Sequence, residues 1–328
     1  MTERASESTR GRTWRRARPL LWGAFFALVA WLLVSHAREI DWQQVFDAVR
    51  RIPPASLAVA AALAAASHAL YSTFDLIGRR WTGHPLPALQ VVPVTFVSYA
   101  FNLNFGALVG GLGLRYRLYS RLGLDEATIA RVLGLSLATN WLGYLVLAGI
   151  VFVAGIVAPP EEFRIGTGAL RALGAVLLAA AAAYLALCAW SRRREYSLRG
   201  HTFMLPPPRM ALIQLALSTL NWLTIAAVIH ALLLQALPYP TVLGVLLVAA
   251  IAGVVTHIPA GLGVIEAVFI ALAGGIVPRG ELLAALLAYR ALYYLAPLAV
   301  AIVVYLLLEA RARAAARDGA ANGTLADQ

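Results

Sequence analysis

Apolar blocks of membrane-spanning length dominate this sequence and constrain its fold more than any other feature. Each block runs for roughly 17 to 29 residues, and a helix of that length, rising about 1.5 Å per residue, crosses the ~30 Å hydrocarbon core of a bilayer. The composition agrees, because 61% of the 328 residues are hydrophobic and 13% are charged. A soluble protein of this size is excluded. We therefore predict an all-α polytopic membrane protein.

Six of the blocks predict simple transmembrane helices, at residues 19–37, 54–77, 129–157, 170–190, 210–237 and 282–308. Two further stretches, 89–122 and 242–277, are broken near the middle by glycine, asparagine or proline. A straight helix cannot contain these breaks without losing part of its hydrogen-bond ladder. Each stretch is also short for two full crossings, so we predict two broken, re-entrant hairpins.

The charges predict an orientation in the membrane. All 27 basic residues are arginine and the net charge is +11. Because most of these arginines lie between apolar blocks, we interpret them as residues that set the membrane topology and contact anionic lipid, and not as a nucleic-acid-binding surface. With the spans above, twenty arginines fall on one side and six on the other, which predicts that both termini are cytoplasmic. Segment 40–52 has helical apolar spacing and predicts a surface helix, with a polar loop as the alternative.

These assignments give a single membrane domain. It covers residues 19–310, after a basic cytoplasmic tail at 1–18 and before a cytoplasmic tail at 311–328 that we expect to be disordered. We expect the protein to lie in a bacterial cytoplasmic (inner) membrane.

The two broken stretches also predict an internal repeat. The matching residues are Pro87 and Pro240, Gly111 and Gly261, and Glu126 and Glu281, which are 153, 150 and 155 positions apart. Each half, about 14–159 and 163–311, has three crossings, and an odd number makes the second half inverted relative to the first. Chance alignment of abundant glycine and alanine is the alternative.

Cofactor chemistry has no visible support in the sequence. Cys188 is the single cysteine, which excludes disulfides and CxxC motifs, and the six histidines form no metal-binding motif. We predict neither a metal nor a cofactor. No nucleotide-binding loop occurs in the sequence, so uphill transport would need an ion or the membrane potential.

A family resemblance adds a functional expectation. Its residues are the run 257–266 (HIPAGLGVIE), then Tyr289, Arg290, Tyr293, Tyr294 and Pro297, and in the first half the segment 104–119. They resemble the membrane domain of lysylphosphatidylglycerol synthases, a flippase-like family, and in the first half its stand-alone YbhN-like branch. Ala260 replaces a motif glycine, and the first half lacks the proline and glutamate common elsewhere in the family.

The resemblance implies a protein that binds a polar phospholipid, anionic or modified, and moves it between leaflets as a flippase or scramblase would. The synthases append a soluble aminoacyltransferase domain, whereas this chain ends about twenty residues after its last span. We therefore expect no enzymatic activity. Alternative functions are secondary transport of a small anionic solute, or a non-transporting partner role in envelope lipid metabolism; a homo-oligomer is also possible.

Polar residues inside the apolar blocks are the candidate site. A charge near the bilayer centre is costly, so Glu266 should have a partner. We predict a pair with Arg290, with Arg115 as the competing partner. The pair would hold a phosphate or other headgroup, or alternatively fix helix packing as a structural ion pair.

The first break is a second candidate, because helix-start N–H groups beside arginine favour an anion. Close helix packing and simple anchoring of the arginines are the alternatives. The predicted substrate-binding set is Asn104, Gly106, Gly110, Gly111, Gly113, Arg115, Arg117, Asn140, His257, Pro259, Gly261, Gly263, Glu266, Arg290 and Tyr293. Other intramembrane polar residues carry structural predictions: His68, Asn221 and His230 as interhelical hydrogen bonders, and Asp75 as an interfacial partner of Arg79.

Overall fold

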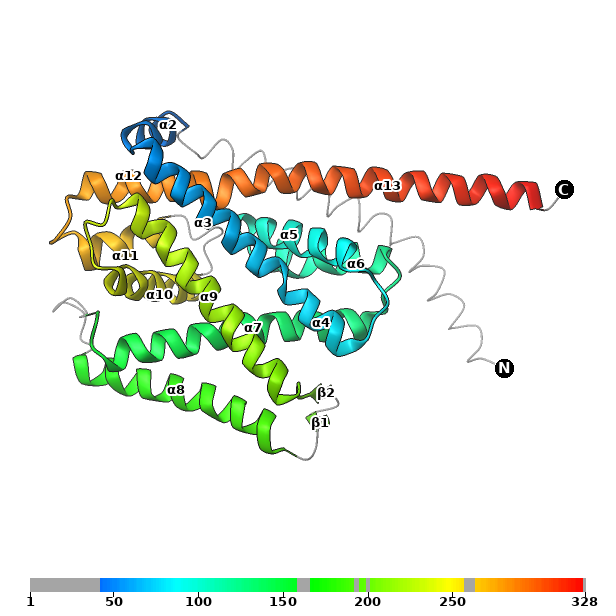
Figure 1. Cartoon of the computed structure of the whole chain (residues 1–328), viewed down its shortest axis with the longest axis horizontal. Helices are drawn as coiled ribbons and strands as arrows, with labels where there is room; N and C mark the ends of the chain where they lie inside the picture. Colours follow the sequence, from blue (N-terminus) through cyan, green and yellow to red (C-terminus); the bar gives the residue numbers. More distant parts are fainter. Residues whose placement is uncertain (1–41, 158–165, 192–194, 199–200, 257–262, 327–328) are drawn as a thin grey trace, which may run out of the picture. The chain divides into compact units, whose positions relative to one another are not determined.

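A computed structural model describes residues 42–157, 166–191, 195–198, 201–256 and 263–326, and it confirms the all-α class (Figure 1). The elements are α2 (Trp42–Arg51), α3 (Pro54–Ser72), α4 (Phe74–Thr82), α5 (Ala88–Phe105), η1 (Ala107–Leu114), α6 (Arg115–Arg121), α7 (Glu126–Val153), α8 (Thr167–Trp190), β1 (Glu195–Leu198), β2 (His201–Met204), α9 (Pro208–Leu232), α10 (Tyr239–Thr256), α11 (Val264–Ala273), α12 (Arg279–Tyr289), η3 (Arg290–Leu295) and α13 (Ala296–Ala326). Both η elements are π-helices.

The chain divides into two units, Met1–Gln44 and Val45–Gln328. The described part of the first unit is the opening of α2, whose helical conformation confirms the helix predicted in segment 40–52. The predicted tail at 1–18 and the predicted span at 19–37 lie outside the described residues. All contacts below belong to the second unit.

Six helical segments within the described residues are long and apolar enough to cross a membrane. Five coincide with predicted spans, namely Pro54–Thr82, Glu126–Val153, Thr167–Trp190, Pro208–Leu232 and Arg279–Arg311. The sixth, α10, is the first arm of the second broken stretch. The discontinuity of both broken stretches is confirmed, and their re-entrant topology stays a prediction.

Two segments differ from the sequence-based expectation. Residues 311–326, which we expected to be disordered, continue α13, because alanine and arginine have high helix propensity. The connection between α8 and α9 contains an antiparallel β-hairpin, in which Glu195 pairs with Met204 and Leu198 with His201.

Local signals fix where several helices begin. Proline occupies the first turns of α3 and α9, where its missing N–H costs no hydrogen bond. At α7 the Asp125 carboxylate accepts a hydrogen bond from the Thr128 N–H at 2.9 Å, and this bonding lowers the pKa of Asp125. The first helix after the broken stretch therefore has a defined start.

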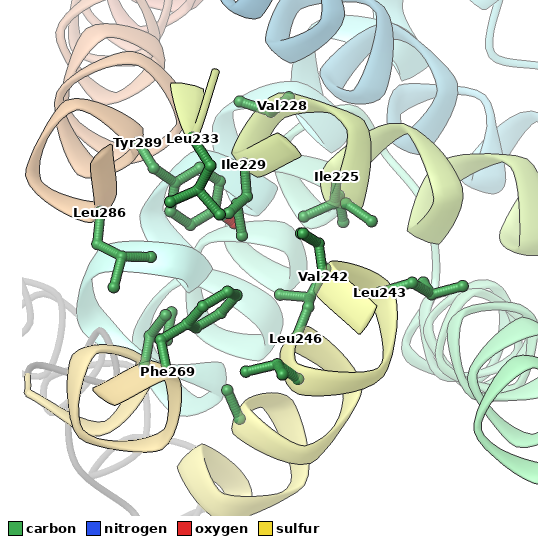
Figure 2. Close-up of a cluster of buried hydrophobic side chains, with 14 of the residues drawn as sticks. Ile225, Val228, Ile229, Leu233, Val242, Leu243, Leu246, Phe269, Leu286 and Tyr289 are labelled. Carbon is green, nitrogen blue, oxygen red and sulfur yellow. The ribbon is translucent and has the colours of Figure 1, made fainter. Parts of the chain in front are cut away.

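The helices pack around a central core. α3 lies across α9, and in Figure 1 the two helices run in opposite directions, with α7 packed on α9 and on α8. Figure 2 shows the part of the core where α9, α10, α11 and α12 meet around Phe269. In a membrane such packing is stabilised by close van der Waals contact, which small residues permit.

Gly143 marks the closest approach of α7 to α9. A Cβ at this position would lie 2.3 Å from the Ser218 Oγ and 2.6 Å from the Ser218 carbonyl carbon. We expect Gly143→Ala to lower the free energy of unfolding by about 1 to 3 kcal/mol through overpacking. Thermal unfolding in detergent measures this, with Gly134→Ala on the same helix as the control, since no neighbouring atom lies within 4 Å there. Equal stability of the two variants would contradict the close contact.

Candidate functional site

The first broken stretch turns back on itself at Gly106. This residue has φ 83°, a left-handed conformation that glycine adopts without strain, and it ends α5. The chain continues as η1, which packs against α5. At Gly110 an added Cβ would lie 1.9 Å from the Asn102 backbone nitrogen, whereas at Gly111 it would meet the Asn102 Oδ1 at 3.0 Å. The glycines of this break therefore permit a close backbone approach.

The second break precedes α11. Gly263 caps this helix with φ 76°, and Glu266 lies in its first turn. The predicted site residues His257, Pro259 and Gly261 lie outside the described residues. α10 and α11, on either side of this segment, pack against each other.

The predicted pair between Glu266 and Arg290 is confirmed. Arg290 donates to the Glu266 carboxylate through Nε, which reaches Oε1, and through Nη2, which lies 2.9 Å from Oε2. The two side chains are 13% and 11% exposed, and the Arg290 Cζ lies 5.6 Å from the centre of the Tyr294 ring. The pair joins α11 to η3. A bidentate, largely buried contact of this kind is geometrically specific.

A chain of hydroxyl groups lies on the other side of η3. The Tyr293 hydroxyl is 2.9 Å from the Tyr99 hydroxyl and 2.7 Å from the Ser67 Oγ, which in turn donates to the Asn221 Oδ1 at 2.7 Å. We call Tyr99, Tyr293, Ser67 and Asn221 the central hydroxyl chain. It links α5, η3, α3 and α9. The predicted interhelical role of Asn221 is confirmed, and Tyr293 is placed at the centre of the network.

Asn104 connects the first break to the same region. Its Nδ2 donates to the Ala100 carbonyl at 2.8 Å and to the Tyr294 carbonyl at 3.2 Å, and the residue is buried. The end of α5 is therefore hydrogen-bonded to the π-helix that carries Arg290.

Arg115 belongs to a separate buried cluster. Its Nη1 lies 3.5 Å from the Asp75 Oδ1 and 3.3 Å from the Ser136 Oγ, while the Tyr119 hydroxyl donates to the Asp75 Oδ2 at 2.7 Å. The predicted interfacial pair of Asp75 with Arg79 is wrong. Asp75 is fully buried one helical turn earlier, and Arg79 donates to the Leu86 carbonyl instead. The competing pair of Arg115 with Glu266 does not form either.

Arg117 forms a third ion pair. It donates to the Glu309 Oε1 from Nη2 at 2.9 Å, and Arg121, whose side chain is partly exposed, donates to Oε2 of the same buried carboxylate. These bonds attach α6 to α13. The arginines after the first break are thus engaged by the carboxylates of Asp75 and Glu309.

Asn140 lies where α7 packs on α9. Its backbone carbonyl accepts hydrogen bonds from the Ser218 Oγ at 2.9 Å and the Trp222 Nε1 at 3.2 Å. One turn later the Tyr144 hydroxyl donates to the Leu247 carbonyl at 2.9 Å. These contacts place Asn140 in helix packing and leave its predicted role in binding a substrate as a prediction. Gly113 lies within η1, half-buried.

Several residues of these networks escaped the sequence analysis. Ser67, Tyr99 and Glu309 come from apolar helices in which single polar residues are common, whereas Asp75 was singled out but given the wrong partner. One signal could have found Ser67. It lies 154 positions before Asn221, which matches the separations of the predicted repeat.

His84 lies beside the Arg115 cluster, in the connection between α4 and α5. The residue is 7% exposed, its ring centre is 6.4 Å from that of Tyr119, and neither ring nitrogen has a hydrogen-bond partner among the described residues. Burial, helped by the positive charge of Arg79 and opposed by the negative charge of Asp75, lowers the pKa of His84. The folded protein therefore disfavours the imidazolium form.

We expect this burial to make folding acid-sensitive. The unfolded chain takes up a proton at His84 below about pH 6.5 while the folded chain resists it, so stability is lost as pH falls below that value. His84→Gln should retain more of its stability on going from pH 8 to pH 5 than the natural protein does. Thermal unfolding at the two pH values tests this, and an identical acid loss in both proteins would show that His84 does not contribute.

Residues 20–301 match the family model described as the lysylphosphatidylglycerol synthase TM region. The chain is 48% identical over 301 residues to the Inner membrane protein YbhN of Escherichia coli (strain K12), across 92% of this chain and 95% of that protein. It is 29% identical to the protein slr0712 of Synechocystis, across 83% and 85%. It is 24% identical to a phosphatidylglycerol lysyltransferase of Staphylococcus haemolyticus, across 85% of this chain and 32% of that protein. Together with the six apolar helices, these matches identify a multi-pass inner membrane protein.

Proposed function

Because the chain belongs to the lysylphosphatidylglycerol synthase TM region family, we propose that it binds a polar phospholipid and moves it between the two leaflets of the inner membrane. The observation that carries the proposal is the bidentate pair of Glu266 with Arg290 at the second break. A guanidinium group binds carboxylate and phosphate with the same geometry. A lipid phosphate can therefore take the place of the Glu266 carboxylate on Arg290, and the guanidinium keeps an anionic partner during the exchange.

The surroundings of Arg290 support this exchange. The pair is not fully enclosed, since 11% of the Arg290 side chain and 13% of the Glu266 side chain are exposed. Arg290 also belongs to a π-helix, a wide turn that is frequent at functional sites. The headgroup would reach Arg290 near the broken helices while the acyl chains stay in lipid. An anionic or modified headgroup fits this site best.

The lysyl transfer named for the staphylococcal relative is not part of the proposal. This chain matches 32% of that relative's length, and the proposed activity needs lipid movement alone. The ligands proposed for this chain are membrane phospholipids.

The proposal includes two inverted halves with both termini in the cytoplasm, as the arginine distribution predicts. Packing supports it: α3 contacts α5 as α9 contacts α10, and α3 and α9 pack against each other with opposite chain directions (Figure 1). Ser67 and Asn221, equivalent positions under the repeat, hydrogen-bond to each other. A two-fold axis between the halves brings residues close to the axis near their equivalents, as this contact does. Cysteines placed beside Gly113 and Gly263 in a Cys188→Ser background should be labelled from opposite sides, and labelling from one side would overturn the inversion.

Reconstitution tests the function itself. The purified full chain is placed in liposomes that contain trace fluorescent phosphatidylglycerol, phosphatidylethanolamine or phosphatidylcholine, and a membrane-impermeant quencher is added outside. Lipid movement makes the probe of the inner leaflet, as well as that of the outer leaflet, accessible to the quencher. We expect the fastest movement for phosphatidylglycerol, which has the anionic headgroup. Uptake of inorganic phosphate with no movement of any lipid would instead favour transport of an anionic solute.

A further inference from the structure

His68 is a buried titratable group that the proposed lipid site does not use. It lies on α3, is 3% exposed, and has the Ala64 carbonyl 3.0 Å from its Nδ1. A carbonyl oxygen can only accept a hydrogen bond, so Nδ1 must carry the proton. This fixes Nε2 as a bare acceptor in the neutral ring. Among the described residues, Nε2 has no hydrogen-bond partner although it is buried.

Aromatic rings surround this imidazole. Ring-centre distances are 4.8 Å to Tyr293, 5.2 Å to Tyr99 and 6.0 Å to Phe96. Two of these rings belong to the central hydroxyl chain, whose other end, the Asn221 Nδ2, is also buried without a partner in the described part of the chain. A proton on Nε2 would add a positive charge to an imidazole that lies among aromatic rings, and the π-systems of such rings attract cations.

The groups that face His68 from each packed element carry no charge. They are Phe96 and Tyr99 of α5, Tyr293 of η3, Ser67 of α3 and, through Ser67, Asn221 of α9. The nearest charged pairs lie one aromatic ring further away. Arg290 is over Tyr294, and Arg115 is 6.0 Å from the centre of Tyr71, which stacks on Tyr99.

The acidic residues of the neighbouring pairs are already occupied. Both oxygens of Glu266 bind Arg290, and the Asp75 oxygens contact Arg115 and Tyr119. A proton on Glu266 would displace one of these bonds, and a proton on Asp75, whose Oδ1 has no hydrogen bond among the described residues, would remove its ion pair with Arg115. Protonation of His68, by contrast, breaks none of the ion pairs found among the described residues.

We propose that His68 Nε2 is a proton-binding site that couples proton uptake to opening of the protein, and this inference rests on the proposed lipid movement. The reaction is proton transfer from water to Nε2, giving an imidazolium and hydroxide that the buffer neutralises. The charged imidazolium has a high free energy in this apolar environment. Protonation therefore favours a conformation in which water reaches Nε2. By linkage, a proton that binds the open conformation better shifts the population towards it. The neutral form then corresponds to the structure described above, in which Nε2 is buried.

The test compares the natural chain with His68→Gln, which cannot take up the proton, and with His230→Gln, a histidine on α9 outside the central hydroxyl chain. Lipid movement is measured in liposomes between pH 4 and pH 8. For the natural chain and His230→Gln we expect the rate to rise as pH falls, by about tenfold per pH unit where a single proton binds. For His68→Gln we expect a rate that does not change with pH. A natural pH slope in His68→Gln would overturn the proposal.

A second measurement keeps the inference separate from the lipid activity. Histidine labelled with ¹⁵N in the full chain, held in lipid nanodiscs, reports ring protonation directly, and the signal missing from His68→Gln identifies His68. A transition to imidazolium between pH 4 and pH 8 supports the proton site even if no lipid moves, in which case the proposed function fails and the site does not. A His68 ring that stays neutral throughout would overturn the proton site whatever the lipid assay shows.

Discussion

Glu266→Gln is expected to lower the free energy of unfolding by about 3 to 5 kcal/mol, because it leaves the Arg290 guanidinium largely buried without its counter-charge. Both side chains are close to nine-tenths buried, so solvent screens the pair little. The same substitution should stop lipid movement, since Arg290 can no longer alternate between two anions. Denaturant or thermal unfolding in detergent measures the first effect, and the liposome assay the second. Glu281→Gln, an exposed glutamate at the start of α12, is the matched control and should change neither.

The exchanged variant Glu266→Arg/Arg290→Glu separates a structural pair from a lipid site. A purely structural pair should tolerate the exchange and keep its activity. If the pair is a headgroup site, the exchanged variant should recover the stability of the protein but not its lipid movement, because the positive charge then lies on α11 instead of η3. Arg290→Lys gives a second comparison, since lysine keeps the charge and loses the bidentate geometry. Full activity of both Glu266→Ala and Arg290→Ala would remove the pair from the mechanism.

Gly110→Ala is expected to have the second large effect. Its Cβ would fall 1.9 Å from the Asn102 nitrogen and 2.3 Å from the Phe101 carbonyl carbon, both backbone atoms of α5 that cannot rotate away. Relief requires η1 to move off α5, so we expect a loss of about 3 kcal/mol or more in stability, at the upper end of overpacking effects. Thermal unfolding and protease sensitivity of the 88–121 region measure it.

Gly111→Ala is the neighbouring control. Its Cβ would meet the Asn102 Oδ1 at 3.0 Å, and a side-chain oxygen can move by a few tenths of an ångström. We therefore expect a smaller loss than at Gly110. Similar losses at both positions would mean that glycine is required there for a reason other than backbone contact.

The sequence predicted the parts of this protein that depend on composition and local chemistry. The lengths of the apolar blocks predicted where the membrane-spanning helices lie, and helix-breaking residues predicted the positions of both discontinuities. The pair of Glu266 with Arg290 was predicted correctly from the cost of leaving a charge unpaired in the membrane. Few charged residues lie within the apolar blocks, and these two have opposite charges.

The sequence analysis predicted the wrong ion-pair partner for Asp75, where another charged residue was close in sequence. Asp75 is four positions from Arg79, a spacing that favours a pair on one helix face, yet α4 turns Asp75 into the core towards Arg115 and Tyr119. Glu309 contacts Arg117 and Arg121, which lie 192 and 188 positions earlier in the sequence. Such long-range contacts depend on how helices pack, which periodicity alone does not determine. The central hydroxyl chain was missed for the same reason, since single serines and tyrosines in apolar helices carry little sequence signal.

The contacts of the first break bear on its alternative interpretations, which were an anion site, close helix packing and anchoring by arginines. Its glycines contact the α5 backbone closely, as expected of a packing surface, and its arginines are paired with carboxylates. The anion site proposed here therefore depends on the second break and on Arg290.

The central claim is that Arg290, released from Glu266 by a lipid phosphate, carries headgroups across the membrane. The most direct measurement is the fraction of inner-leaflet fluorescent phosphatidylglycerol that becomes accessible to an external quencher in liposomes containing the natural chain, Glu266→Gln or Glu281→Gln. The account predicts movement with the natural chain and Glu281→Gln, and none with Glu266→Gln that is verified as folded. Movement at the natural rate by folded Glu266→Gln, or no movement of any headgroup by the natural chain, would contradict it.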